Sequence, residues 1–175
     1  MGPVRREHLV EAIDLDRFLN NIDYPLFIVT VAAENGDGPE SRSGCLVGFA
    51  TQCSIDPPRF LVCISKINHS YALMSCAKVL AVHVIDSDQR ALAELFGGET
   101  GDEIDKFAVC NWHPGPGGVP LLEASRRRII TDVLEHIDFG DHLGLVLAPF
   151  EVRADEHAEA LRPSAIADME PGHPL

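Results

Sequence analysis

The amino-acid sequence predicts a mainly β fold, an antiparallel β-barrel with peripheral helices. The chain contains about six strand-like segments joined mostly by hairpin turns, and strand and helix alternate only around residues 64–96. A doubly wound parallel sheet would need that alternation throughout. The 175 residues, 46% hydrophobic and 23% charged, have the length and composition of a single globular domain.

The first part of the chain predicts a helix and then a hairpin. Over residues 8–21 apolar side chains recur near helical spacing, and Pro25 closes the segment. Residues 26–33 are rich in β-branched side chains, which favour a strand. The sequence Asn-Gly-Asp-Gly at 35–38 is a turn signal that joins antiparallel strands. We therefore expect a helix followed by strand, turn and strand.

The returning strand, residues 43–51, contains Gly44 and Gly48. Glycine weakens a strand interior, so a bend or a close approach by another group is expected there. The next strand, residues 60–64, is apolar at every position. This pattern predicts that both of its faces are covered.

The middle of the chain predicts short helices around one strand. Four elements are expected in turn: a short helix within 69–74, a strand at 79–85, a helix at 89–96 and one more helical turn within 100–107. Ser87 and Asp88 are candidate caps of the third element, and Gly97-Gly98 ends it.

The last third predicts a loop and a long hairpin. Pro and Gly are too dense at 113–118 for a ladder or a helix, so we expect a mobile loop or lid there. Two strands, 128–138 and 143–152, are joined at 140–142. We place the domain at residues 1–152, N-terminal helix included, and treat 153–175 as a tail with one short helix.

Charge and hydropathy exclude several classes of partner. With 14 Lys+Arg against 27 Asp+Glu, the net charge of −13 argues against nucleic acid and against an anionic membrane surface. The longest apolar runs are strand-sized, so no transmembrane span is expected. The first eleven residues lack the apolar core of a signal peptide, and we expect a cytoplasmic protein. The five cysteines, an odd number without a CxxC pair, are expected to be buried structural thiols.

Common catalytic motifs are missing from the sequence. The eight histidines are scattered, with no HExxH and no Cys or His pair at ligand spacing, so we predict no metal site. The order of residues alone leaves a Ser-His-Asp hydrolase open, but no GxSxG elbow is present. The Gly-rich run at 115–118 lacks the GxxxxGK[ST] pattern of a phosphate-binding loop.

One segment is more specific. Residues 44–64 read as a glycine-containing strand, a Ser-Ile-Asp-Pro-Pro turn at 54–58 and an apolar strand. This order resembles the flavin reductase-like family, whose fold is the FMN-binding split barrel. Further ordered matches are Tyr24-Pro25, Val82-His83-Val84-Ile85, the 89–96 helix, Asp105-Lys106-Phe107, residues 118–122 and Gly140-Asp141-His142. Together they cover roughly residues 24–152.

The resemblance implies an NAD(P)H-dependent flavin reductase that binds FMN, with FAD as an alternative, and transfers hydride from nicotinamide C4 to flavin N5. It also implies a homodimer whose second subunit completes the flavin cleft, and a partner monooxygenase that receives reduced flavin. Two alternatives stay open: an enzyme that keeps FMN as a prosthetic group, and a non-catalytic binding or storage protein on the same barrel.

Site residues follow from the resemblance and from the chemistry of flavin. Gly48 would let the backbone approach the ring, and the next six positions would contact its edge: Phe49, Ala50, Thr51, Gln52, Cys53 and Ser54. Four residues before a helix start are expected to hold the phosphate: Lys66, Asn68, His69 and Ser70. The simpler interpretation is that Asn68 or Ser70 only caps that helix.

Two more positions are assigned by the resemblance, each beside a plainer interpretation. His142 corresponds to a histidine beside flavin and nicotinamide, and is our candidate catalytic residue; otherwise it is a hairpin histidine bonded to the backbone. Phe107 would cover the ring, or it is an ordinary core residue. His83 replaces the family's usual Asn and is expected to be a satisfied core group.

The sequence departs from the family in one strand. Leu46 and Gly48-Phe49 stand where many members carry Thr and Ser or Asn, so hydroxyl groups expected to face the flavin are lost. Backbone groups would have to compensate. Other ligands of related split barrels, such as deazaflavin or haem, therefore stay open.

Overall fold

The computed structural model describes residues 15, 18–19, 22–34, 36, 38–101, 104–155 and 159–172. Most of the expected N-terminal helix lies outside these residues; Leu15, Phe18 and Leu19 are helical and exposed. Seven strands form one sheet: β1 (Phe27–Ala32), β2 (Arg42–Val47), β3 (Ala50–Ser54), β4 (Arg59–Ser65), β5 (Val79–Val84), β8 (Arg127–Asp138) and β9 (His142–Ala154). The remaining elements are α2 (Tyr71–Met74), α3 (Arg90–Gly97), α4 (Lys106–Val109), the two-stranded sheet of β6 (Trp112–Pro114) and β7 (Pro120–Leu122), and the 3₁₀ helices η1 (Pro39–Ser41), η2 (Pro116–Gly118) and η3 (Pro163–Ile166).

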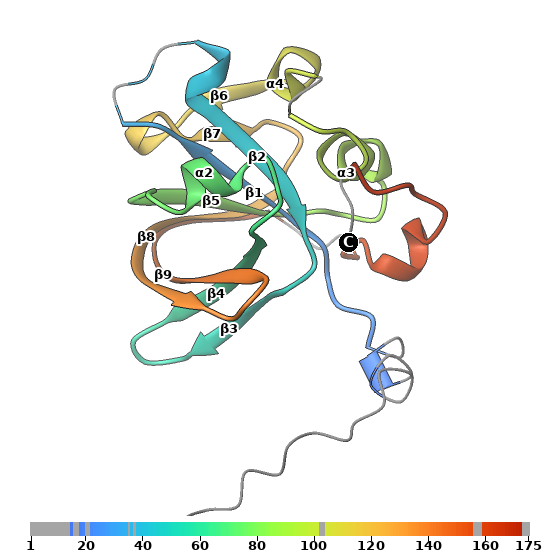
Figure 1. The fold of residues 1–175 in the computed structure, drawn as a ribbon, viewed down its shortest axis with the longest axis horizontal. Coiled ribbons are helices and arrows are strands. Elements are labelled where there is room, and N and C mark those ends of the chain that lie inside the picture. Colours follow the sequence, from blue (N-terminus) through green and yellow to red (C-terminus); the bar gives the residue numbers. More distant parts are fainter. Residues whose placement is uncertain are drawn as a thin grey trace, which may run out of the picture.

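The large sheet is antiparallel and curls on itself (Figure 1). Its strand order is β2-β1-β5-β8-β9-β4-β3, so the two edge strands follow each other in the chain. Only Gly48 and Phe49 separate them, and the Phe49 carbonyl accepts a 2.9 Å hydrogen bond from the Cys63 N–H of β4. The mainly β, antiparallel fold class is confirmed. The expected single strand over 43–51 is bent into β2 and β3, where the glycine signal indicated a bend.

The central strands β1 and β5 have both faces covered. Alternate side chains of each strand point into the barrel, where they meet side chains of β2, β4 and β9. They are Phe27, Val29 and Val31 of β1, and Leu80 and Val82 of β5. Ile28 of β1 points outward into a second core beneath α3 and the C-terminal segment. Because alternate side chains enter two different cores, these strands bury apolar side chains on both faces of the sheet.

Strand β4 differs from the expectation. Val62 and Ile64 are buried inside the barrel, but Leu61 and Cys63 on the other face are only half-buried. The apolar sequence predicts that both faces of β4 are buried, but within one chain only the face inside the barrel is fully buried.

Residues 113–118 form part of a hairpin, where a loop without a ladder was expected. His113 and Pro114 belong to β6, which pairs with β7 in a hairpin, and η2 forms the turn between them. Leu121 of that hairpin packs on Ala81 and Ile130, and Thr30 Oγ1 donates a 2.7 Å hydrogen bond to the Pro120 carbonyl. The many Pro and Gly residues wrongly indicated that no ladder could form here. A ladder of three residue pairs needs few N–H donors, so it tolerates them.

The cap of α3 was predicted wrongly. Gln89 occupies the N-cap position, and its Oε1 accepts from the Asp86 N–H at 3.0 Å. Asp88 instead pairs with Arg126, Nη2 to Oδ2 2.7 Å. The helix ends at Gly97, with Gly98 as its C-cap, as the glycine pair indicated. The extra turn expected within 100–107 is α4, displaced to Lys106–Val109.

The cysteine prediction is correct only for Cys45. Cys63 and Cys110 are half-buried, and Cys53 and Cys76 are exposed; all five are free thiols. Within the described part of the chain, none of the helices has the length and apolar character of a membrane span.

Candidate functional site

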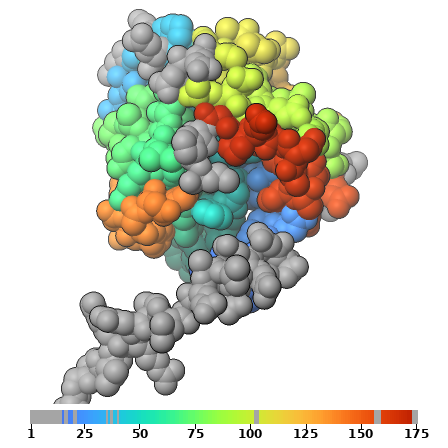
Figure 2. Space-filling view, turned by 45° about the vertical axis from the view of Figure 1, so that its right-hand side comes forward, coloured from blue at the N-terminus to red at the C-terminus, as the bar shows by residue number. Residues whose placement is uncertain are grey.

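A cleft of about 590 Å³ opens where the two ends of the sheet meet. Its walls come from the end of β2, the end of β4, the connection from β4 to α2, the end of α3 and the C-terminal segment. Figure 2 shows that segment, in red, on the surface of the molecule. Six of the predicted site residues line it: Gly48, Phe49, Asn68, His69, Ser70 and His142.

The bend between β2 and β3 forms one wall. Phe49 is 61% exposed although it is aromatic, and its ring lies 5.3 Å from the imidazole of His142, with 49° between the planes. Gly48, beside it, has open space: an added Cβ would meet only Leu26 Cδ2, at 3.8 Å. This wall thus offers an apolar ring next to an uncluttered backbone.

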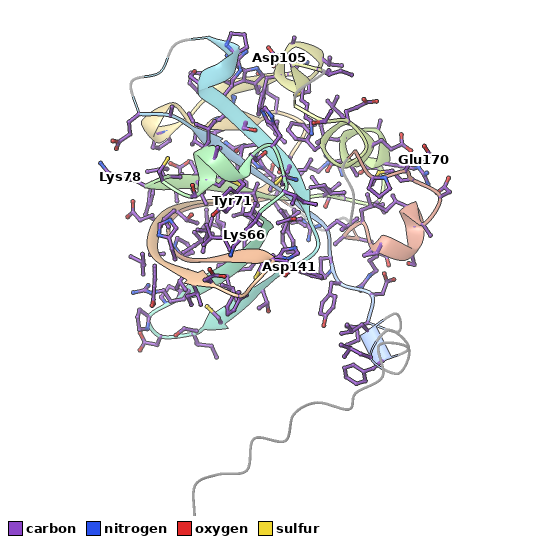
Figure 3. The ribbon with its side chains drawn as sticks, in the orientation of Figure 1. Lys66, Tyr71, Lys78, Asp105, Asp141 and Glu170 are labelled. Atoms are coloured by element: carbon purple, nitrogen blue, oxygen red, sulfur yellow. The ribbon has the colours of Figure 1, made fainter. Side chains whose placement is uncertain are left out.

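His142 begins β9 and is held by its neighbour. Its Nδ1 lies 2.9 Å from Asp141 Oδ1, and this hydrogen bond lowers the pKa of the Asp141 carboxyl. The Asp141 carbonyl accepts from the Lys66 N–H at 2.9 Å, which ties the hairpin turn to the end of β4. In Figure 3, Lys66 and Asp141 lie close together at this end of the hairpin. Because Nδ1 faces Asp141, Nε2 is the ring nitrogen that can meet a ligand.

The predicted phosphate residues are brought together with one exception. Asn68 Oδ1 accepts a 2.9 Å hydrogen bond from the Ser70 N–H, so Asn68 does stabilise the turn into α2. The hydroxyl groups of Ser70, which lines the cleft, and of Ser43 share a buried 2.8 Å hydrogen bond. Lys66 does not line the cleft; its Nζ donates to Asp138 Oδ1 at 2.7 Å.

Residues 50–54 lie elsewhere. They form β3 and line no part of this cleft in the described chain; Thr51, Gln52 and Cys53 are exposed. Sequence order could not show this, because the strand leaves the cleft immediately after Phe49. Their predicted contacts with the flavin edge are therefore not supported by the geometry of one chain.

Phe107 is a core residue in this structure. It is buried, with its ring 5.6 Å from Phe96 and 5.7 Å from Trp112, both in edge-on contacts. It borders an adjacent cleft of about 410 Å³, which shares His69, Gly101 and Lys106 with the first. His83 is a buried core residue whose two ring nitrogens are both hydrogen-bonded, as expected. Nδ1–H donates to the Ile28 carbonyl (3.1 Å), and Nε2 accepts from the Leu122 N–H (3.2 Å).

Sequence reasoning missed two buried groups in the cleft, Lys106 and Cys45. The Nζ of Lys106 donates to the Phe96 carbonyl at 3.1 Å and lies 5.6 Å over the Phe96 ring. Burial lowers the pKa of Lys106, whereas burial raises the pKa of the Cys45 thiol to about 11. A lysine followed by the apolar run Phe-Ala-Val was the available signal.

The C-terminal segment also contributes, and the hairpin thought to be a lid does not. Met169, Pro171 and Gly172 line the cleft, and the Gly172 N–H donates to the Gly97 carbonyl at 2.9 Å. No residue of 113–118 lines it. Among the described residues, no three His, Cys, Asp or Glu side chains gather closely enough to hold a metal ion.

The family is decided by comparison with known proteins. The model described as "Flavin reductase like domain" matches residues 19–165. The chain belongs to the flavin reductase-like family. This confirms the resemblance drawn from the ordered motifs.

Individual relatives of this flavin reductase-like chain agree with that assignment. The FMN reductase (NADH) RutF of Pseudomonas syringae pv. syringae is 28% identical over 125 residues, which are 71% of this chain and 70% of the relative. The reductase subunit HsaB of a flavin-dependent monooxygenase from Rhodococcus jostii is 31% identical over 83% of this chain and 73% of its own. The solved NADH:FAD oxidoreductase SgcE6 of Streptomyces globisporus C-1027 has a TM-score of 0.72, with 20% identity, over 91% of this chain and 87% of its own. That likeness shows a shared fold.

Proposed function

We propose that this protein is an NAD(P)H-dependent flavin reductase that uses FMN, with FAD as an alternative, and that the cleft at Phe49 and His142 holds the flavin. The observation that carries the proposal is the convergence of three separate segments, at residues 48–49, 68–70 and 142, in one cleft of a chain from this family. The names of the relatives described above support the same activity.

The residues of the cleft fit a flat ring with a phosphate at one end. Phe49 provides an exposed apolar surface, and the unobstructed backbone at Gly48 suits a close approach. Asn68, His69 and Ser70 form the polar end, where the phosphate would bind. Lys106 supplies a local positive charge in a chain of net charge −13.

The reaction requires stacking and exclusion of water more than a protein nucleophile. A bound flavin supplies the redox chemistry by accepting hydride from C4 of the nicotinamide. In this proposal His142, which is held by Asp141, orients the nicotinamide or balances charge beside the reduced ring. Met169 and Pro171 help to close the cleft from the side of the C-terminal segment.

The decisive experiment is an anaerobic absorbance titration with FMN and then with NADH. We expect flavin to bind and to bleach when NADH is added. His142→Ala should lower kcat/KM about tenfold, equivalent to ~1.4 kcal/mol. His136→Ala is the matched control, because His136 is exposed on β8 and lines no part of this cleft. Flavin that binds but stays oxidised would favour a non-catalytic binding protein, and no binding would overturn the proposal.

Delivery of reduced flavin to a partner monooxygenase is part of the proposal. It is supported by the Rhodococcus jostii relative, which is named as a reductase subunit of such an enzyme. Gel filtration of the reduced protein under anaerobic conditions tests it. Reduced FMN that elutes apart from the protein agrees with delivery, whereas flavin retained on the protein favours a prosthetic group.

A homodimer is also proposed. It is supported by the half-covered outer face of β4 at Leu61 and Cys63, and by exposed Phe49 and Ile67 at the cleft. Light scattering during size-exclusion chromatography should give twice 19.1 kDa. A mass of one chain would contradict it.

The proposed compartment is the cytoplasm. All five cysteines are free thiols, a state that a reducing compartment maintains, and NAD(P)H is available there. Fractionation of the source cells should recover the protein with cytoplasmic markers; recovery elsewhere would overturn this proposal.

A further inference from the structure

A second cleft, of about 440 Å³, lies away from the flavin cleft and shares no lining residue with it. It is formed where β1, β4 and β8 begin and where β5 and β9 end. Four arginines line it: Arg59, Arg127, Arg128 and Arg153. No acidic residue appears among its described lining residues, although acidic residues outnumber Lys and Arg by 27 to 14 in the whole chain.

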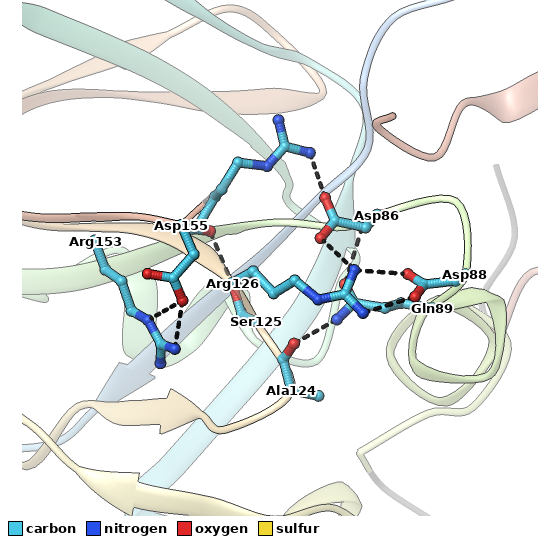
Figure 4. Close-up of polar contacts among 9 residues, drawn as sticks. Asp86, Asp88, Gln89, Ala124, Ser125, Arg126, Arg153 and Asp155 are labelled. Atoms are coloured by element: carbon cyan, nitrogen blue, oxygen red, sulfur yellow. Dashed lines mark hydrogen bonds and ion pairs between the residues drawn. The ribbon is translucent and has the colours of Figure 1, made fainter. Parts of the chain in front are cut away.

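Two of these arginines are compensated by carboxylates. Arg127 pairs with the buried Asp86, which also binds Arg126. The Nε of Arg153 donates to Asp155 Oδ2 at 2.9 Å. Figure 4 shows Asp86 and Asp88 around Arg126, with Arg153 and Asp155 forming a separate pair. These two pairs account for the positive charge on only half of the arginines.

The other two arginines have no carboxylate partner within the described residues. Arg59 donates only to the carbonyl of its neighbour Pro58, at 2.7 Å. The Nε and Nη1 atoms of Arg128 are buried without a hydrogen-bond partner. Arg128 on β8 and Arg153 on β9 are also direct cross-strand partners, so two positively charged side chains stand at facing positions of the ladder.

The electrostatic state of Arg128 follows from these surroundings. Burial and the charge of Arg153 lower the pKa of Arg128, and Glu151 and Asp155 oppose that effect. A guanidinium that is partly desolvated and near a like charge gains from an anion in the adjoining space. Guanidinium groups also match the geometry of carboxylate oxygens.

The rest of the lining is apolar. Phe27 and Phe60 meet edge-on at 5.6 Å, and Val84, Ile129 and Val152 extend the apolar surface. A space of this size suits a small molecule. We propose that this cleft binds a small organic carboxylate with an apolar body, whose carboxylate meets Arg59 and Arg128 and whose apolar part lies against Phe60.

Isothermal titration with benzoate tests the proposal without relying on flavin chemistry. We expect saturable binding of benzoate, weaker binding in high NaCl because the contact is ionic, and no binding of the neutral isostere benzamide at the same concentration. Arg128→Gln should weaken benzoate binding at least tenfold. Arg59→Gln should weaken it about threefold and keeps the test valid if Arg128→Gln does not fold.

The control is Lys78→Gln, which removes the same charge from an exposed side chain paired with Glu34. It should change benzoate affinity less than twofold. Equal binding of inorganic phosphate and benzoate, or unchanged affinity in both arginine variants, would overturn the proposal. So would a change of molar mass in these variants by light scattering, because the cleft would then be a subunit interface.

Discussion

Among single residues, Gly44 and Gly48 differ in what their surroundings require. A Cβ at Gly44 would lie 2.9 Å from Phe96 Cε1 and 3.2 Å from the Val29 carbonyl oxygen. At Gly48 the nearest atom would be 3.8 Å away, an ordinary contact. Packing therefore accounts for the first glycine and not for the second, which lines the proposed flavin cleft.

Alanine at each glycine separates these roles. Gly44→Ala should lower the free energy of unfolding by about 1–3 kcal/mol, because the core must shift around the new methyl group. Gly48→Ala should change it by less than about 1 kcal/mol, but it should weaken FMN binding about tenfold. Urea unfolding and fluorescence titration with FMN measure the two effects. Normal FMN affinity in Gly48→Ala would remove the functional reason for this glycine.

His83 makes stability depend on pH. It is fully buried between two backbone groups, and burial lowers its pKa from 6.5 to about 4. Between pH 6.5 and pH 4 the imidazole of the unfolded chain binds a proton and that of the folded chain does not. The free energy of unfolding therefore falls as the pH decreases through this range. Between pH 7 and pH 5 this group should cost about 2 kcal/mol.

Urea unfolding at pH 7 and pH 5 checks this expectation. His83→Asn keeps an amide donor and acceptor without a group that titrates, so it should show a smaller difference between the two pH values. Four carboxyl groups have a pKa below their ordinary value of 3.8 in the folded chain: Asp88, Asp138, Asp141 and Asp168. Their contribution to stability is lost only below about pH 4, outside the range of the two measurements. An unchanged pH dependence in His83→Asn would contradict the assignment.

At the scale of elements, the C-terminal segment is a structural part of the site. Leu161 and Ile166 are buried in the core beneath α3, and the Leu161 N–H donates to the Ile85 carbonyl at 2.7 Å. Met169, Pro171 and Gly172, which follow, line the flavin cleft. Packing of η3 thus decides where that wall of the cleft stands.

Ile166→Ala tests this coupling. The lost methyl groups should reduce the free energy of unfolding by about 2–4 kcal/mol and weaken FMN binding through the displaced wall. Leu134→Ala, at a half-exposed position on β8, should change stability by about 0.5 kcal/mol or less. Urea unfolding and FMN titration report both effects. Unchanged FMN affinity in a destabilised Ile166→Ala protein would show that the segment only supports the fold.

For the whole molecule, closure of the sheet and net charge are the governing features. Closure places β2 beside β4 and creates the flavin cleft at the seam, while the opposite end of several strands carries the arginine cleft. Each subunit of the proposed dimer carries the full net charge of −13, so the dimer carries twice that charge. Two such subunits repel each other over distances that depend on salt.

The proposed dimer should therefore be more stable at moderate salt than at low salt. The Debye length falls from about 30 Å at 0.01 M to about 10 Å at 0.1 M, which screens the repulsion between subunits. Sedimentation equilibrium at 10 mM and 150 mM NaCl should give a lower dissociation constant at the higher salt. The opposite trend would indicate that attractive ion pairs across the interface dominate.

Local sequence signals predicted most of the elements, and they failed where packing overruled them. The bend at Gly48, the β8–β9 hairpin and the end of α3 depend on glycine and on side-chain alternation over a few residues, so they could be predicted. The β6–β7 hairpin could not be predicted, because Leu121 is stabilised by contacts with Ala81 and Ile130 in distant strands. The exposure of Cys53 likewise depends on which face of β3 is covered.

The sequence alone determined the fold class, the family and the three segments that supply Gly48, Asn68 and His142, because turns, apolar periodicity and ordered motifs are properties of neighbouring residues. The tertiary structure alone decided that residues 50–54 and Lys66 leave the cleft, that Lys106 and the C-terminal segment enter it, and that four arginines meet at a second cleft. These outcomes depend on strand register and on closure of the sheet. Both are set by contacts between residues far apart in the chain, which no local pattern records.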